Sequence, residues 1–260
     1  MSRQSVPVLA HPAEEIRMTI QRLFPDPSGP TDVTVAYGSP TGSHPDRPWV
    51  GLSMVASIDG STAVGRTSNT LSGTTDQLVY QQLRSIADVV LVGAGTARLE
   101  GYGPPSQPGQ RIGVVTRRGT VDTSTDLFTS GSGFVITTMK THVEARGTDV
   151  IRAGTAEVNL QLALDTVAEI CPIAGFVLVE GGPTLNAAFI DADLFDEINV
   201  TTSPLTVSGN GPRLAMGGVD QSRRFELAHL GLDDESFMFA RWRRCGTGLS
   251  EIAATDRDAS

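Results

Sequence analysis

The chain has 260 residues, of which 39% are hydrophobic, so it can bury one substantial core. It carries 29 acidic and 20 basic side chains, and the resulting net charge of -9 argues against nucleic acid or an anionic membrane as a partner, since both require a basic face. The chain has no apolar run approaching the roughly 20 residues of a membrane span and no start typical of a signal peptide, which predicts a soluble protein that is not exported. Its two cysteines lack metal-ligand spacing, which predicts no disulfide framework and no metal site. The cytoplasm is the compartment that these features predict.

The two ends of the chain are predicted to lie outside the folded domain. Residues 1–48 are interpreted as an N-terminal arm, in which Ile16, Ile20 and Leu23 have helical spacing and a stretch rich in proline, glycine and serine follows. Residues 246–260 are small and polar, which predicts a disordered tail. The domain is therefore expected to cover 49–245.

From Trp49 onward, apolar strand-like runs alternate with helical patterns. The predicted elements are a strand over 50–56, a helix over 75–87, strands over 89–92, 112–116 and 134–138, a helix over 158–170, a strand over 176–180, a helix over 183–191, and strands over 197–202, 225–230 and 236–242. Strands separated by helices indicate a mostly parallel sheet covered by helices. The last two strands are predicted to form an antiparallel hairpin at the C-terminal edge, so the fold class is α/β with a mixed sheet.

The most informative feature is a glycine turn between the strand over 176–180 and the helix after it. Its residues are Glu180, Gly181, Gly182, Pro183, Thr184 and Leu185. Proline has the fixed φ of a first helical residue, and free backbone N–H groups with the helix dipole suit a phosphate or pyrophosphate. The turn therefore predicts an anionic cofactor, with an ordinary strand-to-helix turn as the alternative.

A second glycine junction lies upstream at Gly93 and Gly95, directly after another apolar strand. The two glycines would let a phosphate or ribose approach the backbone closely, although Arg98 replaces the third glycine of the dinucleotide fingerprint. Two such junctions at two strand ends predict a ligand crevice between them. The helix before this strand is expected to begin with a capping box formed by Thr74 and Gln77.

Two further strand ends carry polar residues. Asp59 is either a turn residue before a glycine or a carboxylate at the mouth of the crevice, where burial would raise its pKa. Thr116 ends the strand over 112–116, and Arg117 and Arg118 follow it. The arginines either place a guanidinium beside a nucleotide 2′-phosphate or lie on the surface without a ligand.

Three motifs, in this order, resemble the reductase module of riboflavin biosynthesis. They are Ser57-Ile58-Asp59-Gly60, Val92-Gly93-Ala94-Gly95-Thr96 and the turn from Val179 to Leu185. That family is similar to the C-terminal half of the bifunctional pyrimidine deaminase/reductase and has a dihydrofolate-reductase-like fold. The resemblance covers about 49–242 and implies a homodimeric enzyme. It also implies that NADPH delivers hydride to the sugar C1′ of 5-amino-6-(5-phosphoribosylamino)uracil and converts the ribosyl group to ribityl.

The resemblance also implies site residues by matching positions. Substrate contacts fall on Ser68, Arg84 and Glu180, and the NADPH site on Val55, Thr70, Thr96, Glu100 and the turn from Gly182 to Ala188. Asp59 matches the family's acid in the substrate pocket and is our candidate for proton transfer. The zinc-deaminase signature is absent, which predicts a substrate that is already deaminated.

Three alternatives stay open. The chain is a reductase of another flat heterocycle such as dihydrofolate, a non-catalytic NADP-binding regulator, or a purely structural α/β module. Assays with both substrates separate the first alternative from the riboflavin reading. NADPH binding without oxidation identifies the second, and the third predicts no nucleotide binding.

Overall fold

The computed structural model describes residues 19–172 and 174–245. The strands are β1 (Thr19–Phe24), β2 (Gly29–Asp32), β3 (Trp49–Ser57), β4 (Val89–Gly93), β5 (Arg111–Val115), β6 (Gly133–Thr137), β7 (Asp149–Arg152), β8 (Phe176–Val179), β9 (Glu197–Ser203), β10 (Phe225–Leu232) and β11 (Met238–Arg244). The helices are α1 (Val33–Ala36), α2 (Thr74–Ile86), α3 (Ala94–Glu100), α4 (Asp126–Thr129), α5 (Leu160–Ile170) and α6 (Pro183–Asp191). Ile16 and the predicted tail lie outside the described residues.

Within the described ranges, the strands form one eleven-stranded mixed sheet in the order β2-β1-β10-β11-β9-β3-β8-β4-β5-β6-β7. Every neighbouring pair from β9 to β7 is parallel, and every pair from β9 to β2 is antiparallel. This arrangement confirms the predicted fold class. The elements predicted from Trp49 onward lie within two residues of the observed ones.

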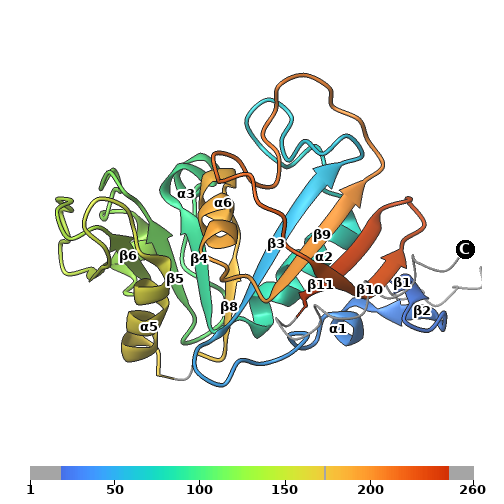
Figure 1. Ribbon diagram of the computed structural model, residues 1–260, viewed down its shortest axis with the longest axis horizontal. Coiled ribbons are helices and arrows are strands. Elements are labelled where there is room, and N and C mark those ends of the chain that lie inside the picture. Colours follow the sequence, from blue (N-terminus) through green and yellow to red (C-terminus); the bar gives the residue numbers. More distant parts are fainter. Residues whose placement is uncertain (1–18, 173, 246–260) are drawn as a thin grey trace, which may run out of the picture.

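Helices cover both faces of the sheet, because successive side chains of a buried strand point to opposite sides. On β4, Val90 and Val92 pack in one core cluster with Leu83 of α2. Val89 and Leu91 pack in the other cluster with side chains of α5 and α6. In Figure 1, α5 and α6 lie in front of the sheet and α2 lies behind it.

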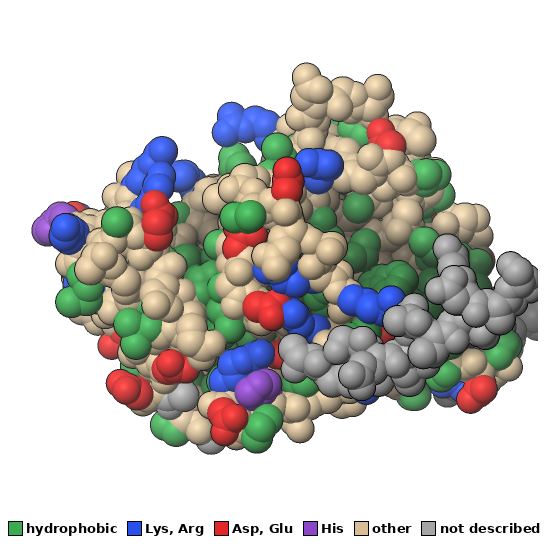
Figure 2. Space-filling view, in the orientation of Figure 1, with side chains coloured by type: hydrophobic (Ala, Val, Ile, Leu, Met, Phe, Trp, Pro, Cys, Tyr) green, Lys and Arg blue, Asp and Glu red, His purple; other side chains and the backbone are tan. Residues whose placement is uncertain are grey.

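The surface on the α5 and α6 side carries charges of both signs. Figure 2 shows acidic and basic side chains interspersed over this face. In the described part of the chain, no helix is both long enough and apolar enough to span a bilayer.

The N-terminal segment differs from its sequence prediction. Ile20 and Leu23 belong to the strand β1, so the helix suggested by their spacing is wrong. β1 pairs with β10, and β2 pairs with β1. A strand is favoured here because β10 offers unpaired backbone groups that a helix would leave unsatisfied. The C-terminal hairpin of β10 and β11 is antiparallel as predicted, while β1 and β2 form the outermost pair.

The structure also corrects the prediction for the start of α2. The helix begins at Thr74 with Gly73 as its N-cap, and no side chain caps it. The backbone N–H of Gln77 donates to the carbonyl of Gly73 at 3.0 Å. The predicted capping box therefore does not form, because Thr74 already lies inside the helix.

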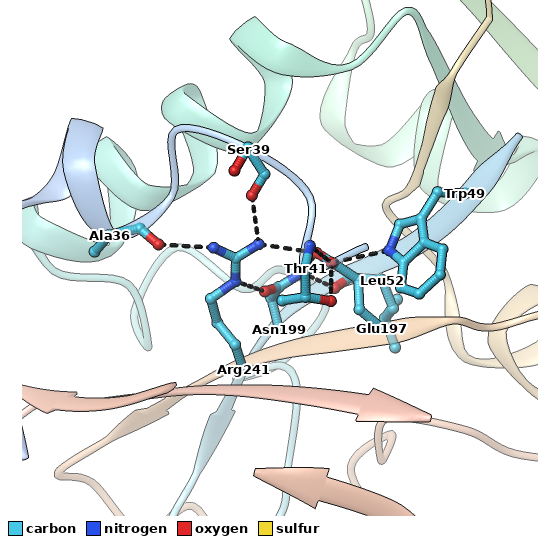
Figure 3. A network of polar contacts seen from close by, with 8 residues as sticks. All are labelled: Ala36, Ser39, Thr41, Trp49, Leu52, Glu197, Asn199 and Arg241. Carbon is cyan, nitrogen blue, oxygen red and sulfur yellow. Dashed lines mark hydrogen bonds and ion pairs between the residues drawn. The ribbon is translucent and has the colours of Figure 1, made fainter. Parts of the chain in front are cut away.

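A buried polar network ties the segment between α1 and β3 to the antiparallel part of the sheet (Figure 3). Arg241 of β11 donates to Glu197 and Asn199 of β9, and to two carbonyls at and after the end of α1. Glu197 also accepts from Thr41 and from the indole N–H of Trp49. Burial alone would raise the pKa of Glu197, but Arg241 and the hydrogen bonds from Asn199 and Thr41 hold it below its ordinary value.

Candidate active site

A cleft of about 1130 Å³ opens on the α2 side of the sheet, beyond the carboxyl ends of β3 and β8. Its walls come from the end of β3, the loop after β3, one face of α2, the end of α3 and the turn between β8 and α6. The carboxyl ends of parallel strands are where open α/β sheets bind ligands. This cleft is therefore the candidate ligand site.

The turn from β8 to α6 forms one wall of the cleft. Gly181 has φ of 85°, a conformation that favours glycine, and the Gly181–Gly182 peptide bond is cis. Gly182 is the N-cap of α6, Pro183 is its first residue, and no side chain caps the helix. The first N–H groups of a helix have no partner within it, so this end is open to an anion as predicted.

The two glycine junctions meet in space. The backbone N–H of Gly93 donates to the carbonyl of Gly181 at 2.6 Å. A Cβ placed on Gly182 would lie 2.7 Å from the hydroxyl oxygen of Thr96. The two junctions predicted from the sequence are therefore in direct contact, and a side chain at Gly182 would collide with that of Thr96.

Glu180 is the centre of a polar cluster at the cleft wall. Its carboxylate accepts from Nε and Nη2 of Arg84 at 2.7 and 2.8 Å, and from the hydroxyls of Tyr102 at 2.6 Å and Tyr80 at 3.1 Å. The guanidinium of Arg84 also lies over both tyrosine rings, 4.9 and 5.1 Å from their centroids. Burial, and secondly the nearby Glu180, raise the pKa of both tyrosines, so their hydroxyls remain protonated donors.

This cluster changes the expectation for Arg84. The resemblance implies that Arg84 contacts the phosphorylated substrate, but the charge of Arg84 is already matched by Glu180. Glu180 itself is 6% exposed and faces the cleft. Among the described residues that line the cleft, Arg66 is the other cation.

Three more predicted residues lie at the cleft wall and one does not. Val55, Ser68 and Glu100 line the cleft, whereas Thr70 is exposed outside it. Desolvation, and secondly the nearby Glu180, raise the pKa of Glu100, although the residue is exposed; a hydrogen bond from Ser68 acts in the opposite direction. Glu100 is therefore more readily protonated than an ordinary glutamate.

Thr116 and Arg117 lie at the end of β5, outside the cleft wall. The hydroxyl of Thr116 accepts from the backbone N–H of Gly119 at 3.1 Å. Arg117 pairs with Glu157 at 2.6 Å, and both side chains are exposed. Exposed ion pairs contribute little, so this pair does not prevent Arg117 from meeting a ligand phosphate.

The structure contradicts the expected raised pKa of Asp59. Its carboxylate is exposed and accepts from the hydroxyl of Ser57 at 2.6 Å and from the backbone N–H groups of Val207 and Ser208 at 3.0 and 2.7 Å. These bonds, that of Ser57 first, lower its pKa to about 2. Asp59 is also not part of the cleft wall. The geometry agrees with the alternative of a turn residue that anchors the loop after β9.

One acid of the cleft wall was not predicted from the sequence. Asp76, in the first turn of α2, is 9% exposed and lines the cleft. Burial raises its pKa, against hydrogen bonds from Ser72 and Thr201. A signal was available, because Asp76, Tyr80 and Arg84 are spaced by four residues and share one helix face.

The part of the chain that the structure describes holds no group of three or more His, Cys, Asp or Glu side chains arranged to bind a metal ion.

Comparisons with known sequences all match this chain to proteins of one family. A family model described as the RibD C-terminal domain matches residues 48–239. Riboflavin biosynthesis protein RibD of Bacillus amyloliquefaciens is 28% identical over 198 residues, which are 70% of this chain and 53% of that protein. A 2,5-diamino-6-ribosylamino-4(3H)-pyrimidinone 5′-phosphate reductase of Methanothermobacter thermautotrophicus is 27% identical over 188 residues, 66% of this chain and 85% of that protein. The chain thus spans about half the length of the RibD relative.

Solved structures share the fold. A pyrimidine reductase-like protein of Corynebacterium diphtheriae superposes with a TM-score of 0.70 at 23% identity, over 82% of this chain and 98% of that one. The riboflavin biosynthesis reductase Rib7 of Saccharomyces cerevisiae superposes with a TM-score of 0.61 at 17% identity, over 82% and 97%.

Proposed function

Because the chain belongs to the RibD C-terminal domain family, we propose that it is an NADPH-dependent reductase of riboflavin biosynthesis. Its reaction is reduction of the ribosyl group of a ribosylaminopyrimidine 5′-phosphate to a ribityl group, with 5-amino-6-(5-phosphoribosylamino)uracil as the substrate that the sequence resemblance implies. The observation that carries the proposal is the cleft in which the two glycine junctions meet beside the cluster of Glu180 and Arg84.

The glycine turn fits a dinucleotide. The N-terminus of α6 is uncapped, Gly182 has no side chain to obstruct it, and Thr96 stands across the crevice. Backbone N–H groups at Thr184 and Leu185 would hold the pyrophosphate, and Val55 at the end of β3 would contact the nicotinamide. When bound, NADPH supplies the hydride that the reaction requires. Arg117 remains the candidate for the 2′-phosphate.

The substrate is proposed to lie along α2. Ser68 and Glu180 contact it, and Arg66 and the free Nη1 of Arg84 offer donors to its phosphate. The ribosyl ring must first open to an imine, with the C1′–O4′ bond breaking and the N–H proton moving to O4′. The hydride then adds to C1′, and a proton must reach the imine nitrogen attached to C1′. Glu100 replaces Asp59 as the candidate donor, because its carboxyl lines the cleft and is the more readily protonated of the two.

Replacing Glu180 by glutamine is expected to raise KM for the phosphorylated pyrimidine about 10- to 100-fold, with less than a threefold change in the Kd for NADPH. The amide cannot hold both nitrogens of Arg84 and both tyrosine hydroxyls as the carboxylate does. Steady-state kinetics and NADPH fluorescence titration measure the two constants. Tyr80→Phe is the matched control, since it removes the longest bond of the cluster. A loss of NADPH affinity alone would show that Glu180 belongs to the cofactor site.

Replacing Asp59 by asparagine is expected to leave kcat within about twofold of the wild type. The side chain lies outside the cleft wall and accepts its hydrogen bonds from a loop. Initial rates with the phosphorylated pyrimidine and saturating NADPH test this expectation. A decrease in kcat of tenfold or more at unchanged thermal stability would show that Asp59 takes part in the reaction.

The function itself is tested by following NADPH oxidation at its absorbance band with the uracil compound and with dihydrofolate. Oxidation with the pyrimidine supports the proposal, and oxidation with dihydrofolate alone makes the chain a reductase of a different heterocycle. NADPH binding without oxidation by either compound identifies a regulator, and no binding leaves a structural module. The proposed enzyme is a homodimer, as the resemblance implies, and is cytoplasmic, as the few cysteines without a disulfide pattern indicate.

A further inference from the structure

The connection between β9 and β10, residues 204–224, contains no helix or strand. We call it the strap. Loops of this length without secondary structure are uncommon in compact domains, and those that occur are typically binding loops or lids. In Figure 1 the strap runs from the end of β9 beside the loop after β3 and then past α6. It therefore connects the two sides of the cleft to which the proposed function assigns the substrate and the cofactor.

The first part of the strap is attached to the loop after β3. Asp59 accepts from two backbone N–H groups of the strap at 3.0 and 2.7 Å, and the backbone N–H of Thr62 donates to the carbonyl of Pro212 at 2.8 Å. Thr62 and Pro212 line the cleft, as does Ser68 of the same loop, which is a proposed substrate contact. The strap therefore holds the loop that is proposed to bind the substrate.

The second part of the strap is attached to α6. The amide of Asn186 donates to the carbonyl of Leu214 at 2.7 Å, and the backbone N–H of Met216 donates to the carbonyl of Pro183 at 3.1 Å. Pro183 is the first residue of α6, directly after the glycine turn. The carbonyls of Pro212 and Leu214 are two residues apart, which is at most about 7 Å of chain. A shift of α6 therefore also moves the part of the strap that holds the loop after β3.

Asn186 lies between the strap and the glycine turn. Its side chain is fully buried and is not part of the cleft wall. A Cβ placed on Gly181 would lie 3.5 and 3.7 Å from the nitrogen and the oxygen of its amide, so the turn packs directly against this group. The nitrogen holds the strap, while the oxygen has no hydrogen-bond partner among the described residues. Because an unpaired buried acceptor is costly, a shift of the turn that brought a donor to this oxygen would be favourable.

We propose, on the basis of the proposed function, that Asn186 is a positioning residue through which the cofactor raises the affinity for the phosphorylated pyrimidine. Cofactor bound at the glycine turn fixes the start of α6. Asn186 then holds the strap, and the strap holds the loop after β3 through Asp59 and Pro212. A loop that is already held in its binding conformation costs less to order when the substrate binds. Such coupling is reciprocal, so the pyrimidine raises the affinity for the cofactor by the same factor.

Calorimetric titrations measure this coupling with NADP⁺ and 5-amino-6-(5-phosphoribosylamino)uracil, each alone and with the other at saturation. In the wild type, we expect each ligand to lower the Kd of the other about 10-fold. Asn186→Ala is expected to reduce both factors to less than about twofold. Asp59→Ala releases the strap at its other attachment, on the exposed surface, and is expected to have the same effect. Its kcat at saturating concentrations of both ligands should stay within about twofold of the wild type, while KM for the pyrimidine rises.

Two further variants separate coupling through the strap from unrelated defects. The double variant Asn186→Ala, Asp59→Ala is expected to show no further loss of coupling than either single variant, because both changes interrupt the same connection. Asn159→Ala is the matched control. Asn159 caps α5 by accepting from the backbone N–H of Leu162 at 3.0 Å, and it is not part of the cleft wall. This control is expected to lower thermal stability and to keep the coupling of the wild type.

Independent binding of the two ligands by the wild type would overturn the inference. It would also be overturned if Asn186→Ala bound NADP⁺ more weakly but kept the wild-type coupling, since the residue would then act on the cofactor site alone. If circular dichroism shows that Asn186→Ala does not fold, unchanged coupling in Asp59→Ala overturns the inference instead. A wild type that binds neither NADP⁺ nor the pyrimidine overturns the proposed function together with the inference. Binding of both without coupling removes the inference alone.

Discussion

Replacing Glu197 by alanine is expected to lower the free energy of unfolding by about 3–5 kcal/mol. The side chains of Glu197 and Arg241 are 0% and 5% exposed. Without the carboxylate, Arg241 keeps a buried charge with no opposite charge beside it. Thr41 and the indole of Trp49 also lose their acceptor. Urea unfolding followed by circular dichroism measures the change.

The neighbouring strand pair supplies a control for this prediction. Glu226 of β10 pairs with Arg243 of β11, but their side chains are 42% and 48% exposed. Glu226→Ala is therefore expected to change the free energy of unfolding by less than about 1 kcal/mol. A similar small loss in Glu197→Ala would mean that water or a rearranged loop satisfies Arg241, contrary to the network in Figure 3.

Replacing Gly181 by valine is expected to raise the Kd for NADPH about 100-fold. Gly181 has φ of 85°, which a β-branched residue adopts only with strain. Its added Cβ would also lie 3.3 Å from the sulfur of Met54, another residue of the cleft wall. The turn must then shift, and the N-terminus of α6 shifts with it. Fluorescence titration of NADPH measures the loss.

Gly131→Val separates this effect from backbone strain in general. Gly131 has φ of 80° but lies before the amino end of β6, whereas the cleft lies beyond the carboxyl ends of β3 and β8. The control is expected to lose thermal stability and keep its affinity for NADPH. If both variants lose affinity for NADPH equally, or if Gly181→Val loses none, the glycine turn does not contribute to the cofactor site.

Local patterns predicted the parallel half of the fold well, because the signals there lie within each element. The helix predicted over 183–191 matches α6, since a glycine turn and a proline mark its start. The strand β1 could not be found in the same way. Its pairing partner β10 lies about 200 residues further along the chain, and no sequence pattern near Ile20 indicates that pairing.

Two aspartates, one predicted at the cleft and one found there, show a similar limit. Asp59 follows a strand and precedes a glycine, so its local pattern resembles that of a cleft residue. The structure places it on an exposed loop anchor. Asp76 has an ordinary position in a helix, yet packing against Thr201 buries it in the cleft. Whether a side chain is buried depends on which residues of distant elements pack against it, and a local sequence pattern does not contain that information.

The short hairpin of β1 and β2 has a consequence for association between copies of the protein. A sheet edge with free N–H and C=O groups is a template for pairing with another chain. β2 has four residues, including Pro30, which has no N–H to donate, and the opposite edge strand β7 is equally short, with charged residues at both ends. The family match begins at residue 48, so a fragment cut there would lack the hairpin and leave the eight-residue strand β10 exposed. The N-terminal strands thus protect the long antiparallel edge from intermolecular strand addition and aggregation.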